Sequence, residues 1–209
     1  MPIRCVVGLG NPGPRYRWSR HNAGFWLLDR LAHDAFRSWE RADAALETSG
    51  EIEGEGVVLL KPQTYMNRSG EAVGACMRRH GFAPEDLLVV VDDVALPAGR
   101  LRLRPFGSAG GHRGLLSIEE SIESRDYARL RVGVLGDREE DEDLADYVLD
   151  PLDEDEKAFF KGVIERGVEA VRFLLREGLP KAMNRFNPAS LETGDRDRPA
   201  ARAGDSNIS

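Results

Sequence analysis

Short apolar runs alternate along this chain with segments in which apolar residues recur at helical spacing. A continuous apolar run is typical of a buried strand. Such runs predict strands at 3–7, 57–62, 86–92 and 129–135. Residues 100–104 alternate between basic and apolar side chains with period two, which predicts a half-exposed strand. Weaker strands are predicted at 45–49 and 51–53, with a break at Gly50.

Helical periodicity predicts four helices, at 23–39, 69–79, 115–123 and 156–177. Gly178 follows the last of them, in the position where glycine usually ends a helix. Strands that alternate with helices predict an α/β fold. We expect a single-domain three-layer sandwich with a mixed, mainly parallel twisted sheet flanked by helices. The domain covers residues 1–187, because residues 188–209 contain almost no large apolar side chains and predict a disordered tail.

The net charge of −7 argues at first sight against a nucleic-acid partner. The charge is unevenly placed, because residues 137–156 contain twelve acidic residues and one basic residue, Arg138. This segment alone carries −11 and the rest of the chain +4, so the total charge says little about partners. We interpret 137–156 as an acidic, lid-like segment, whose charge would repel an anionic partner.

The chain has no run of 18 or more apolar residues, so no membrane-spanning helix is predicted. The apolar stretch at the N-terminus is too short for a secretory signal, which predicts a cytoplasmic protein. The two cysteines, Cys5 and Cys76, fall on a predicted strand and a predicted helix and lack metal-ligand spacing. We therefore interpret them as reduced, structural residues.

The segment from Gly8 to Gly13 fits the pattern G-x-G-x-x-G after a strand, which is typical of dinucleotide sites. In such sites the glycines open directly into a helix. Here Pro12 and Pro14 occupy that place, and the helical segment begins further along the chain. We therefore favour a glycine turn that allows two chain segments to approach closely, with Asn11 at the end of the first strand.

Polar residues follow several of the predicted strands. They are Asn11 after the first strand, Thr64, Tyr65 and Asn67 after 57–62, Asp92 and Asp93 at the end of 86–92, and His112 after 100–104. If these strands run parallel, their carboxyl ends meet at one edge of the sheet, where open α/β sheets place their sites. His21, at the start of the first helix, would face the same edge. We therefore predict one crevice that combines a histidine, a carboxylate and two asparagines.

The chemistry of this set fits hydrolysis by an activated water molecule. A histidine takes a proton from water near neutral pH, and a carboxylate holds its tautomer and stabilises the imidazolium. Asparagine amides bind a carbonyl oxygen as it gains charge. No serine or cysteine lies in a G-x-S-x-G motif, so water is the better nucleophile. Chemistry alone does not choose between Asp92 and Asp93, and His21 and Asn67 also fit ordinary helix-capping roles.

Five blocks of sequence, in order and in register from about residue 3 to 187, resemble bacterial peptidyl-tRNA hydrolases. The blocks are Val-Gly-Leu-Gly-Asn-Pro-Gly (7–13), Ser-Arg-His-Asn-Ala-Gly-Phe (19–25), Lys-Pro-Gln-Thr-Tyr-Met-Asn-Arg-Ser-Gly (61–70), Asp-Asp-Val-Ala-Leu-Pro-Ala-Gly (92–99) and Gly-Ser-Ala-Gly-Gly-His-Arg-Gly (107–114). The resemblance implies a monomeric enzyme without metal or cofactor that cleaves the ester between a peptide and the 3′-terminal ribose of tRNA. Its substrate would be peptidyl-tRNA, bound through the acceptor stem, the 3′ CCA end and the peptide. Its work would recycle tRNA from prematurely released peptidyl-tRNA.

The resemblance also implies roles for individual residues. It assigns the role of general base to His21. It assigns the role of orienting carboxylate to Asp92, because the first aspartate of block 92–99 aligns with the family and the second does not. Asn11 and Asn67 are the residues that the resemblance implies hold the substrate and polarise its carbonyl. Further residues that line the crevice are Tyr16, Asn22, Tyr65, Met66 and His112.

One residue departs from the family pattern. The family often has asparagine after the Gly-Gly-His of the glycine loop, whereas this chain has Arg113. Arginine cannot accept a hydrogen bond, so it does not copy an amide that positions water. We expect Arg113 to hold a phosphate or the terminal ribose region instead. The alternative function, an RNA-binding protein of the same fold without hydrolytic activity, is favoured by Arg113 alone.

Basic side chains on two predicted strands suit an RNA partner. Arg102 and Arg104 match basic positions that the family uses near the tRNA 5′-phosphate and acceptor stem, and Arg129 and Arg131 lie on the neighbouring strand. Phosphate contacts of this kind bind RNA without reading its sequence. A solvated strand face is the alternative interpretation of the same charges.

Overall fold

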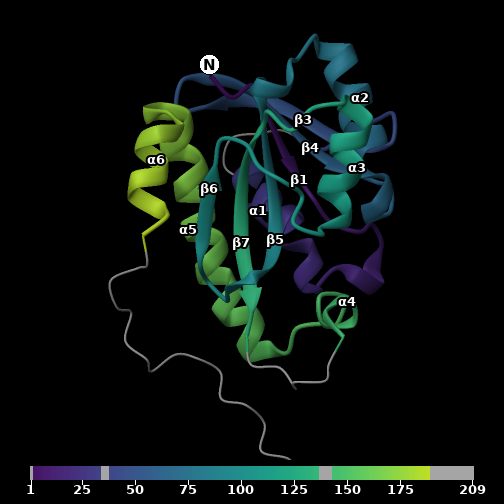
Figure 1. The fold of residues 1–209 in the computed structure, drawn as a ribbon, viewed down its shortest axis with the longest axis vertical. Helices are drawn as coiled ribbons and strands as arrows, with labels where there is room; N and C mark the ends of the chain where they lie inside the picture. The colour runs from purple at the N-terminus through teal and green to yellow at the C-terminus, as the bar shows by residue number, and fades with distance from the viewer. Residues whose placement is uncertain (1, 34–37, 137–142, 189–209) are drawn as a thin grey trace, which may run out of the picture.

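The computed structural model describes residues 2–33, 38–136 and 143–188. Its centre is a seven-stranded sheet with the order β2-β3-β4-β1-β5-β7-β6 (Figure 1). The strands are β1 (Cys5–Gly8), β2 (Glu40–Ala42), β3 (Ala45–Ile52), β4 (Glu55–Pro62), β5 (Leu87–Pro97), β6 (Leu101–Arg104) and β7 (Ala128–Leu135). The central strands β4, β1, β5 and β7 run parallel, while β2, β3 and β6 extend the sheet through antiparallel pairs.

Helices cover both faces of the sheet. The α-helices are α1 (Ala23–His33), α2 (Ser69–His80), α3 (Arg113–Ile122), α4 (Leu144–Tyr147), α5 (Glu154–Glu177) and α6 (Leu179–Phe186). Short 3₁₀ helices are η1 (Pro14–Tyr16), η2 (Arg20–Asn22), η3 (Met66–Arg68) and η4 (Pro84–Asp86). Val6 and Val90 pack against α1, α5 and α6, whereas Val7 and Val89 face α2 and α3. The predicted three-layer sandwich is thus confirmed, and Figure 1 shows α2 and α3 on one side and α5 and α6 on the other.

The strand prediction was wrong at Gly50. The segments 45–49 and 51–53 belong to one strand, β3, because Gly50 pairs with Val57 inside the antiparallel ladder with β4. The chain turns instead at Glu53 and Gly54, whose φ angles are 54° and 85°. Two consecutive residues with positive φ are typical of a tight hairpin turn, so the reversal comes a few residues later than predicted.

The first helix is shorter than predicted, and several short elements, among them β2, α4 and α6, were not predicted. α1 ends at His33, residues 34–37 lie outside the described residues, and Trp39 lies directly before β2. Both β2 and α6 are too short to give a clear periodic signal. α2, by contrast, ends as expected, because Gly81 adopts a left-handed conformation after its last residue.

The strand before the glycine loop does not run parallel to the central strands. β6 pairs antiparallel with β7, so it ends at the edge opposite to the ends of β1, β4 and β5. The expectation that His112 follows a parallel strand was therefore wrong. Only residues 98–100 join β5 to β6, which is too short for the crossover that a parallel strand needs.

Part of two predicted segments lies outside the described residues, namely 137–142 of the acidic segment and 189–209 of the tail. The described remainder of the acidic segment contains α4 and the start of α5. Asp153 caps α5, and Glu156 completes a capping box with it. Within the described ranges, no helix has the length and apolar character needed to cross a lipid bilayer.

Candidate active site

The structure brings the predicted site residues from separate segments to the carboxyl edge of the parallel strands. Asn11 follows β1, Met66 follows β4, and Asp92 is the middle residue of β5, just beyond the part of β5 that pairs with β1. His21 belongs to η2, which precedes α1, and His112 is the N-cap of α3. The predicted convergence of a histidine and an aspartate is therefore present, and a second histidine joins them.

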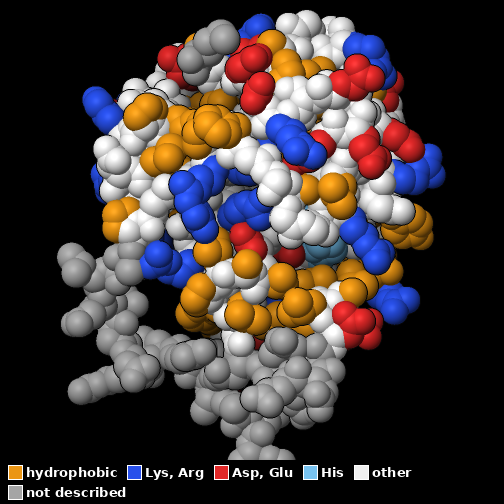
Figure 2. Space-filling view, in the orientation of Figure 1, with side chains coloured by type: hydrophobic (Ala, Val, Ile, Leu, Met, Phe, Trp, Pro, Cys, Tyr) orange, Lys and Arg blue, Asp and Glu red, His pale blue; other side chains and the backbone are white. Residues whose placement is uncertain are grey.

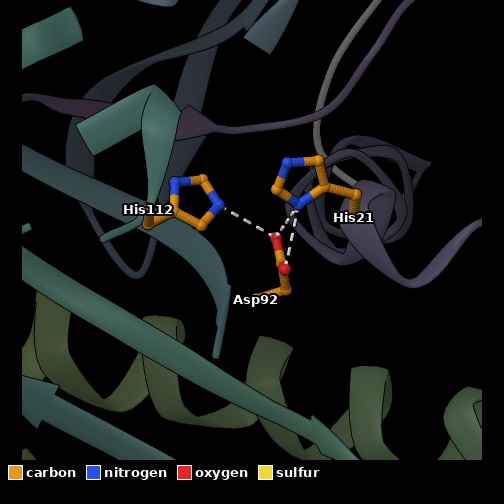
Figure 3. A group of neighbouring side chains, drawn as sticks. All are labelled: His21, Asp92 and His112. Carbon is orange, nitrogen blue, oxygen red and sulfur yellow. Dashed lines mark hydrogen bonds and ion pairs between the residues drawn. The ribbon is translucent and has the colours of Figure 1, made fainter. Parts of the chain in front are cut away.

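His21, Asp92 and His112 form a hydrogen-bonded cluster, shown in Figure 3. The Nδ1 atom of His21 lies 2.9 and 3.0 Å from the two carboxylate oxygens of Asp92. The Nε2 atom of His112 lies 3.1 Å from Asp92 Oδ1. The Asp92 side chain is only 2% exposed, and those of His21 and His112 are 13% and 9% exposed. One buried carboxylate thus serves two imidazoles.

The hydrogen bonds assign the tautomers of both histidines. His112 Nδ1 accepts from the backbone N–H groups of Gly114 and Leu115, at 3.2 and 3.4 Å. The proton of neutral His112 is therefore on Nε2 and is donated to Asp92. His21 donates its Nδ1 proton to Asp92, which leaves the lone pair on its Nε2 atom free to accept a proton.

Charges in the cluster keep Asp92 ionised. Burial alone raises the pKa of Asp92, but the charges and hydrogen bonds of His21 and His112 outweigh burial and hold the pKa far below its usual range. Burial lowers the pKa of His21, and the Asp92 carboxylate raises it by more, so the net pKa of His21 is raised. The positive charge of Arg113 by itself lowers the pKa of His21. The arrangement therefore stabilises an imidazolium at His21.

Alternation along β5 separates Asp92 from Asp93. Asp92 follows Val90 on the face that packs against α1, where His21 arrives. Asp93 points to the other face, where its carboxylate pairs with Arg131 Nη1 at 3.1 Å. Successive residues of a strand face opposite sides, so only one of the two aspartates reaches His21.

Two asparagines fix the loop after β1. Asn22 is 3% exposed, and its side chain accepts from the Asn11 backbone N–H at 2.8 Å and donates to the Asn11 carbonyl at 3.0 Å. Asn11 in turn accepts from the Met66 backbone N–H through Oδ1, at 2.9 Å. The Asn11 Nδ2 group has no acceptor among the described residues, so it is the part of this side chain that remains for a ligand.

The other predicted crevice residues differ in how they are placed. Asn67 and Tyr65 are exposed in and beside η3, with Tyr65 64% exposed, whereas Met66 between them is buried. Tyr16 is half-buried, and the Arg15 guanidinium lies 5.5 Å above its ring. The hydrogen bonds of Tyr16 stay within its own loop, so no described contact joins it to the histidine cluster.

The glycines of 8–13 act as the close-approach interpretation predicts. A Cβ atom on Gly8 would lie 2.4 Å from the Gly24 carbonyl oxygen, and one on Gly10 would lie 2.7 Å from the Phe25 ring. Side chains at these positions would push α1 away from β1. Only a three-residue 3₁₀ turn, η1, follows the motif directly, so the helix N-terminus that a dinucleotide site requires is missing from these described residues.

The described part of the acidic segment supports the loop that carries His21, a role that its composition did not indicate. The His21 backbone N–H donates to the Val148 carbonyl at 2.9 Å. Arg20, only 7% exposed, pairs with Glu156, and its guanidinium lies 4.1 Å above the Tyr147 ring. These contacts attach α4 and the start of α5 to η2 and so help to position His21.

Two arginines hold the glycine loop against β7. Arg129 is fully buried and donates to the carbonyls of Gly107 and Ser108 at 2.5 and 3.1 Å. Arg131 donates to the Ser108 carbonyl at 2.8 Å and pairs with Asp93. The loop thus returns along β7 from the end of β6 and delivers His112 to the site. Their partners inside the protein leave Arg129 and Arg131 less suited to bind phosphate than the sequence suggested.

Three further arginines have no such partners among the described residues. Arg102 and Arg104 pair across the ladder with Arg131 and Arg129, so all four side chains leave the same face of the sheet. Arg102 is exposed and Arg104 half-buried, and neither has an ion pair within the described structure. Arg113 is exposed at the first position of α3. Figure 2 shows basic side chains over β6 and β7 beside a hollow that contains acidic and histidine side chains.

His21, Asp92 and His112 also form one of two groups in the described residues whose donor atoms lie close enough to hold a metal ion. A metal on His21 Nδ1 would displace the proton to Nε2 and remove the free lone pair. The hydrogen-bonded cluster and a metal centre are therefore alternative uses of these side chains, and only the first provides a base.

Comparison with known proteins places this chain in one family. The sequence model of the family described as peptidyl-tRNA hydrolase matches residues 5–194. A peptidyl-tRNA hydrolase of Moorella thermoacetica is 47% identical over 187 residues, which cover 88% of this chain and 98% of that protein. One of Geotalea daltonii is 41% identical over 192 residues, which cover 91% and 100%.

A solved structure agrees with the sequence relatives. The crystal structure of peptidyl-tRNA hydrolase from Acinetobacter baumannii superposes with a TM-score of 0.81 at 36% identity, over 88% of this chain and 94% of that one. Family, fold and length therefore all agree. This chain belongs to the peptidyl-tRNA hydrolase family.

Proposed function

We propose that this protein hydrolyses the ester that joins a peptide, or an N-blocked aminoacyl group, to the 3′-terminal ribose of tRNA, with His21 as general base. Family membership supports the activity and the substrate class. The observation that carries the role of His21 is its free Nε2 atom, with Nδ1 bound to an ionised Asp92. That combination is what activation of water at neutral pH requires.

The steps follow from the proton positions. Water gives a proton to His21 Nε2 as its oxygen attacks the ester carbonyl, and the Asp92 carboxylate stabilises the resulting imidazolium. The carbonyl oxygen gains negative charge, and the free amides of Asn11 and Asn67 donate to it. Each such donor contributes about 3 kcal/mol in comparable sites. The imidazolium then returns the proton to the ribose oxygen, which releases tRNA and a peptide acid.

His112 acts as a positioning residue in this scheme. Its Nε2–H donates to Asp92 Oδ1, while its Nδ1 is held by the first turn of α3. The carboxylate is thereby kept ionised and directed at His21. His112 supplies no free base itself, because both of its ring nitrogens are already engaged.

The arginines supply the attraction for RNA. Arg102 and Arg104, on β6, offer two cations without ion-pair partners in the described structure, and Arg113 adds a third whose charge acts on His21. We propose that they bind phosphates of the acceptor stem and the 3′ end. We further propose that the protein acts in the cytoplasm as a monomer and that ester hydrolysis itself uses no metal or cofactor.

The pH dependence of ester release tests the proposal. In an assay with N-blocked aminoacyl-tRNA, kcat/KM is expected to rise with pH and then level off, because protonated His21 cannot accept a proton. The Asp92 carboxylate raises the pKa of His21, so the midpoint should lie above the ordinary imidazole value. A protein that binds the tRNA without any release at any pH would instead be the RNA-binding alternative.

Removal of the free cations should weaken binding rather than chemistry. The double variant Arg102→Ala/Arg104→Ala is expected to raise KM roughly tenfold or more with little change in kcat. The slope of log affinity against log salt should also decrease by about two, because two phosphates would no longer be neutralised by a bound cation. Arg41→Ala, on the opposite edge strand β2, is the matched control. An unchanged salt slope in the double variant would show that these arginines form only a solvated strand face.

A further inference from the structure

A second group of nitrogen, oxygen and sulfur ligands lies at the far end of α2 from η3. Cys76 and His80 are four residues apart on α2, so both side chains leave the same face of the helix. Glu47 comes from β3. Each of the three offers one ligand atom, and these atoms lie within 4.8 Å of one another. The proposed mechanism uses none of these residues.

The contacts in this group keep its donor atoms near enough to one another to share one metal ion. His80 Nε2 lies 2.8 Å from Glu47 Oε1, and a cation between them would need only a small opening. The His80 ring stacks on Phe82, with centroids 5.0 Å apart and an angle of 9°, which sets its orientation. Cys76 is 1% exposed, whereas the His80 side chain is 29% exposed, so the group opens to solvent on the histidine side.

We propose that Cys76, His80 and Glu47 form a binding site for a thiophilic divalent cation such as Zn²⁺, separate from the catalytic cluster. Thiolate, imidazole and carboxylate are the ligands that Zn²⁺ uses in proteins, and three of them leave a fourth position for water. Binding forms a metal–sulfur bond at Cys76 and releases the thiol proton to solvent.

The neighbouring charges fit a divalent ion. Arg79 pairs with Glu47 Oε2 and with Asp43, which leaves Glu47 Oε1 on the side of His80. The metal-bound Cys76 thiolate, Glu47 and Asp43 each carry one negative charge, and Arg79 carries one positive charge. The group therefore has two net negative charges, which one divalent cation neutralises. Ion pairs of this kind around the ligands orient them as outer-shell contacts do in known metal sites.

Cys5 completes the environment behind Cys76. Cys5 and Cys76 are both free, buried cysteines of the same apolar cluster. Cys5 is therefore the neighbouring thiol that an experiment must separate from the proposed ligand Cys76. The two cysteines lack metal-ligand spacing in the sequence, and the group emerges only when α2 and β3 bring His80 and Glu47 to Cys76.

The function of such a site would be structural. A bound ion would join the last turn of α2 to β3, and binding to the folded state alone stabilises that state. The experiment is a titration of the full-length, reduced and chelator-treated protein with Co²⁺, followed by absorption, and with Zn²⁺, followed by thermal unfolding. We expect one equivalent of Co²⁺ to give a thiolate-to-cobalt charge-transfer band, Zn²⁺ to displace it, and Zn²⁺ to raise the Tm.

Variants identify the ligands. Cys76→Ser should abolish the band, and His80→Gln should weaken the affinity by more than about tenfold. Cys5→Ser should keep the band, because Cys5 is not one of the proposed ligands. His21→Ala, which removes the other potential metal group, should keep it as well. Circular dichroism and ester release by Cys76→Ser and His80→Gln report that the fold is intact. No thiolate band at one equivalent of Co²⁺, or a band that survives Cys76→Ser, would overturn the proposal.

Discussion

His21→Ala is expected to lower kcat/KM for ester release by roughly 10²- to 10⁴-fold, the usual contribution of a general base. The reason is that no other described side chain near the cluster offers a free acceptor nitrogen. His112 uses Nδ1 on the α3 backbone and Nε2 on Asp92. The measurement is steady-state release of the N-blocked aminoacyl group from tRNA, with binding of the same tRNA measured separately.

The fold should survive this change, because the His21 backbone N–H keeps its bond to the Val148 carbonyl. Thermal unfolding and tRNA affinity are therefore expected to stay close to wild type. His33→Ala, an exposed histidine at the end of α1, is the matched control and should retain full activity. Near-wild-type release by His21→Ala would remove this residue from the mechanism, whereas partial rescue by added imidazole would support its role.

Asp92→Asn should also lower kcat strongly, by roughly 10²- to 10⁴-fold, while tRNA binding changes little. The amide of asparagine has the shape of the carboxylate but not its charge. Its NH₂ group is a donor, so it cannot accept the hydrogen bond that His21 Nδ1–H donates. Loss of the charge also removes the effect that raises the pKa of His21. The midpoint of the remaining pH–rate profile should therefore move to lower pH, a shift that a merely structural defect would not produce.

Asp93→Asn provides a control of identical chemistry one residue away. Asp93 pairs with Arg131 on the opposite face of the strand, so its loss should leave the pH profile unchanged and affect kcat much less. If both variants lost activity equally with the same pH profile, Asp92 would have no special role toward His21. The comparison thus tests the prediction that strand alternation selects Asp92.

Most of the fold could be predicted from local patterns. Continuous apolar runs located the central strands, and helical periodicity located α1, α2 and α5, because both patterns reflect which side of an element faces the core. Errors arose where the local signal was weak: Gly50 continues a strand through pairing with Val57, and three-residue β2 carries no readable period. The direction of β6 followed from the length of a connection rather than from a pattern.

The identity of the candidate site was largely determined by the sequence itself. Asn11, His21, Asn67, Asp92 and His112 stand in five ordered blocks, and the family that these blocks resemble is the family to which the chain belongs. The uneven placement of charge could also be predicted from the sequence, because the acidic residues of 137–156 and the basic residues of 100–104 are separated along the chain. These features are read from residue type and order alone.

What only the tertiary structure decided is which side chains share a partner. Asp92 serves both His21 and His112, which lie 71 and 20 residues away, and Asn22 holds the Asn11 backbone. Arg131 holds a loop instead of facing solvent, and Glu156 supports η2 through Arg20. Such choices depend on distances between segments far apart in the chain, and hydrophobic periodicity reports only the local direction of each side chain.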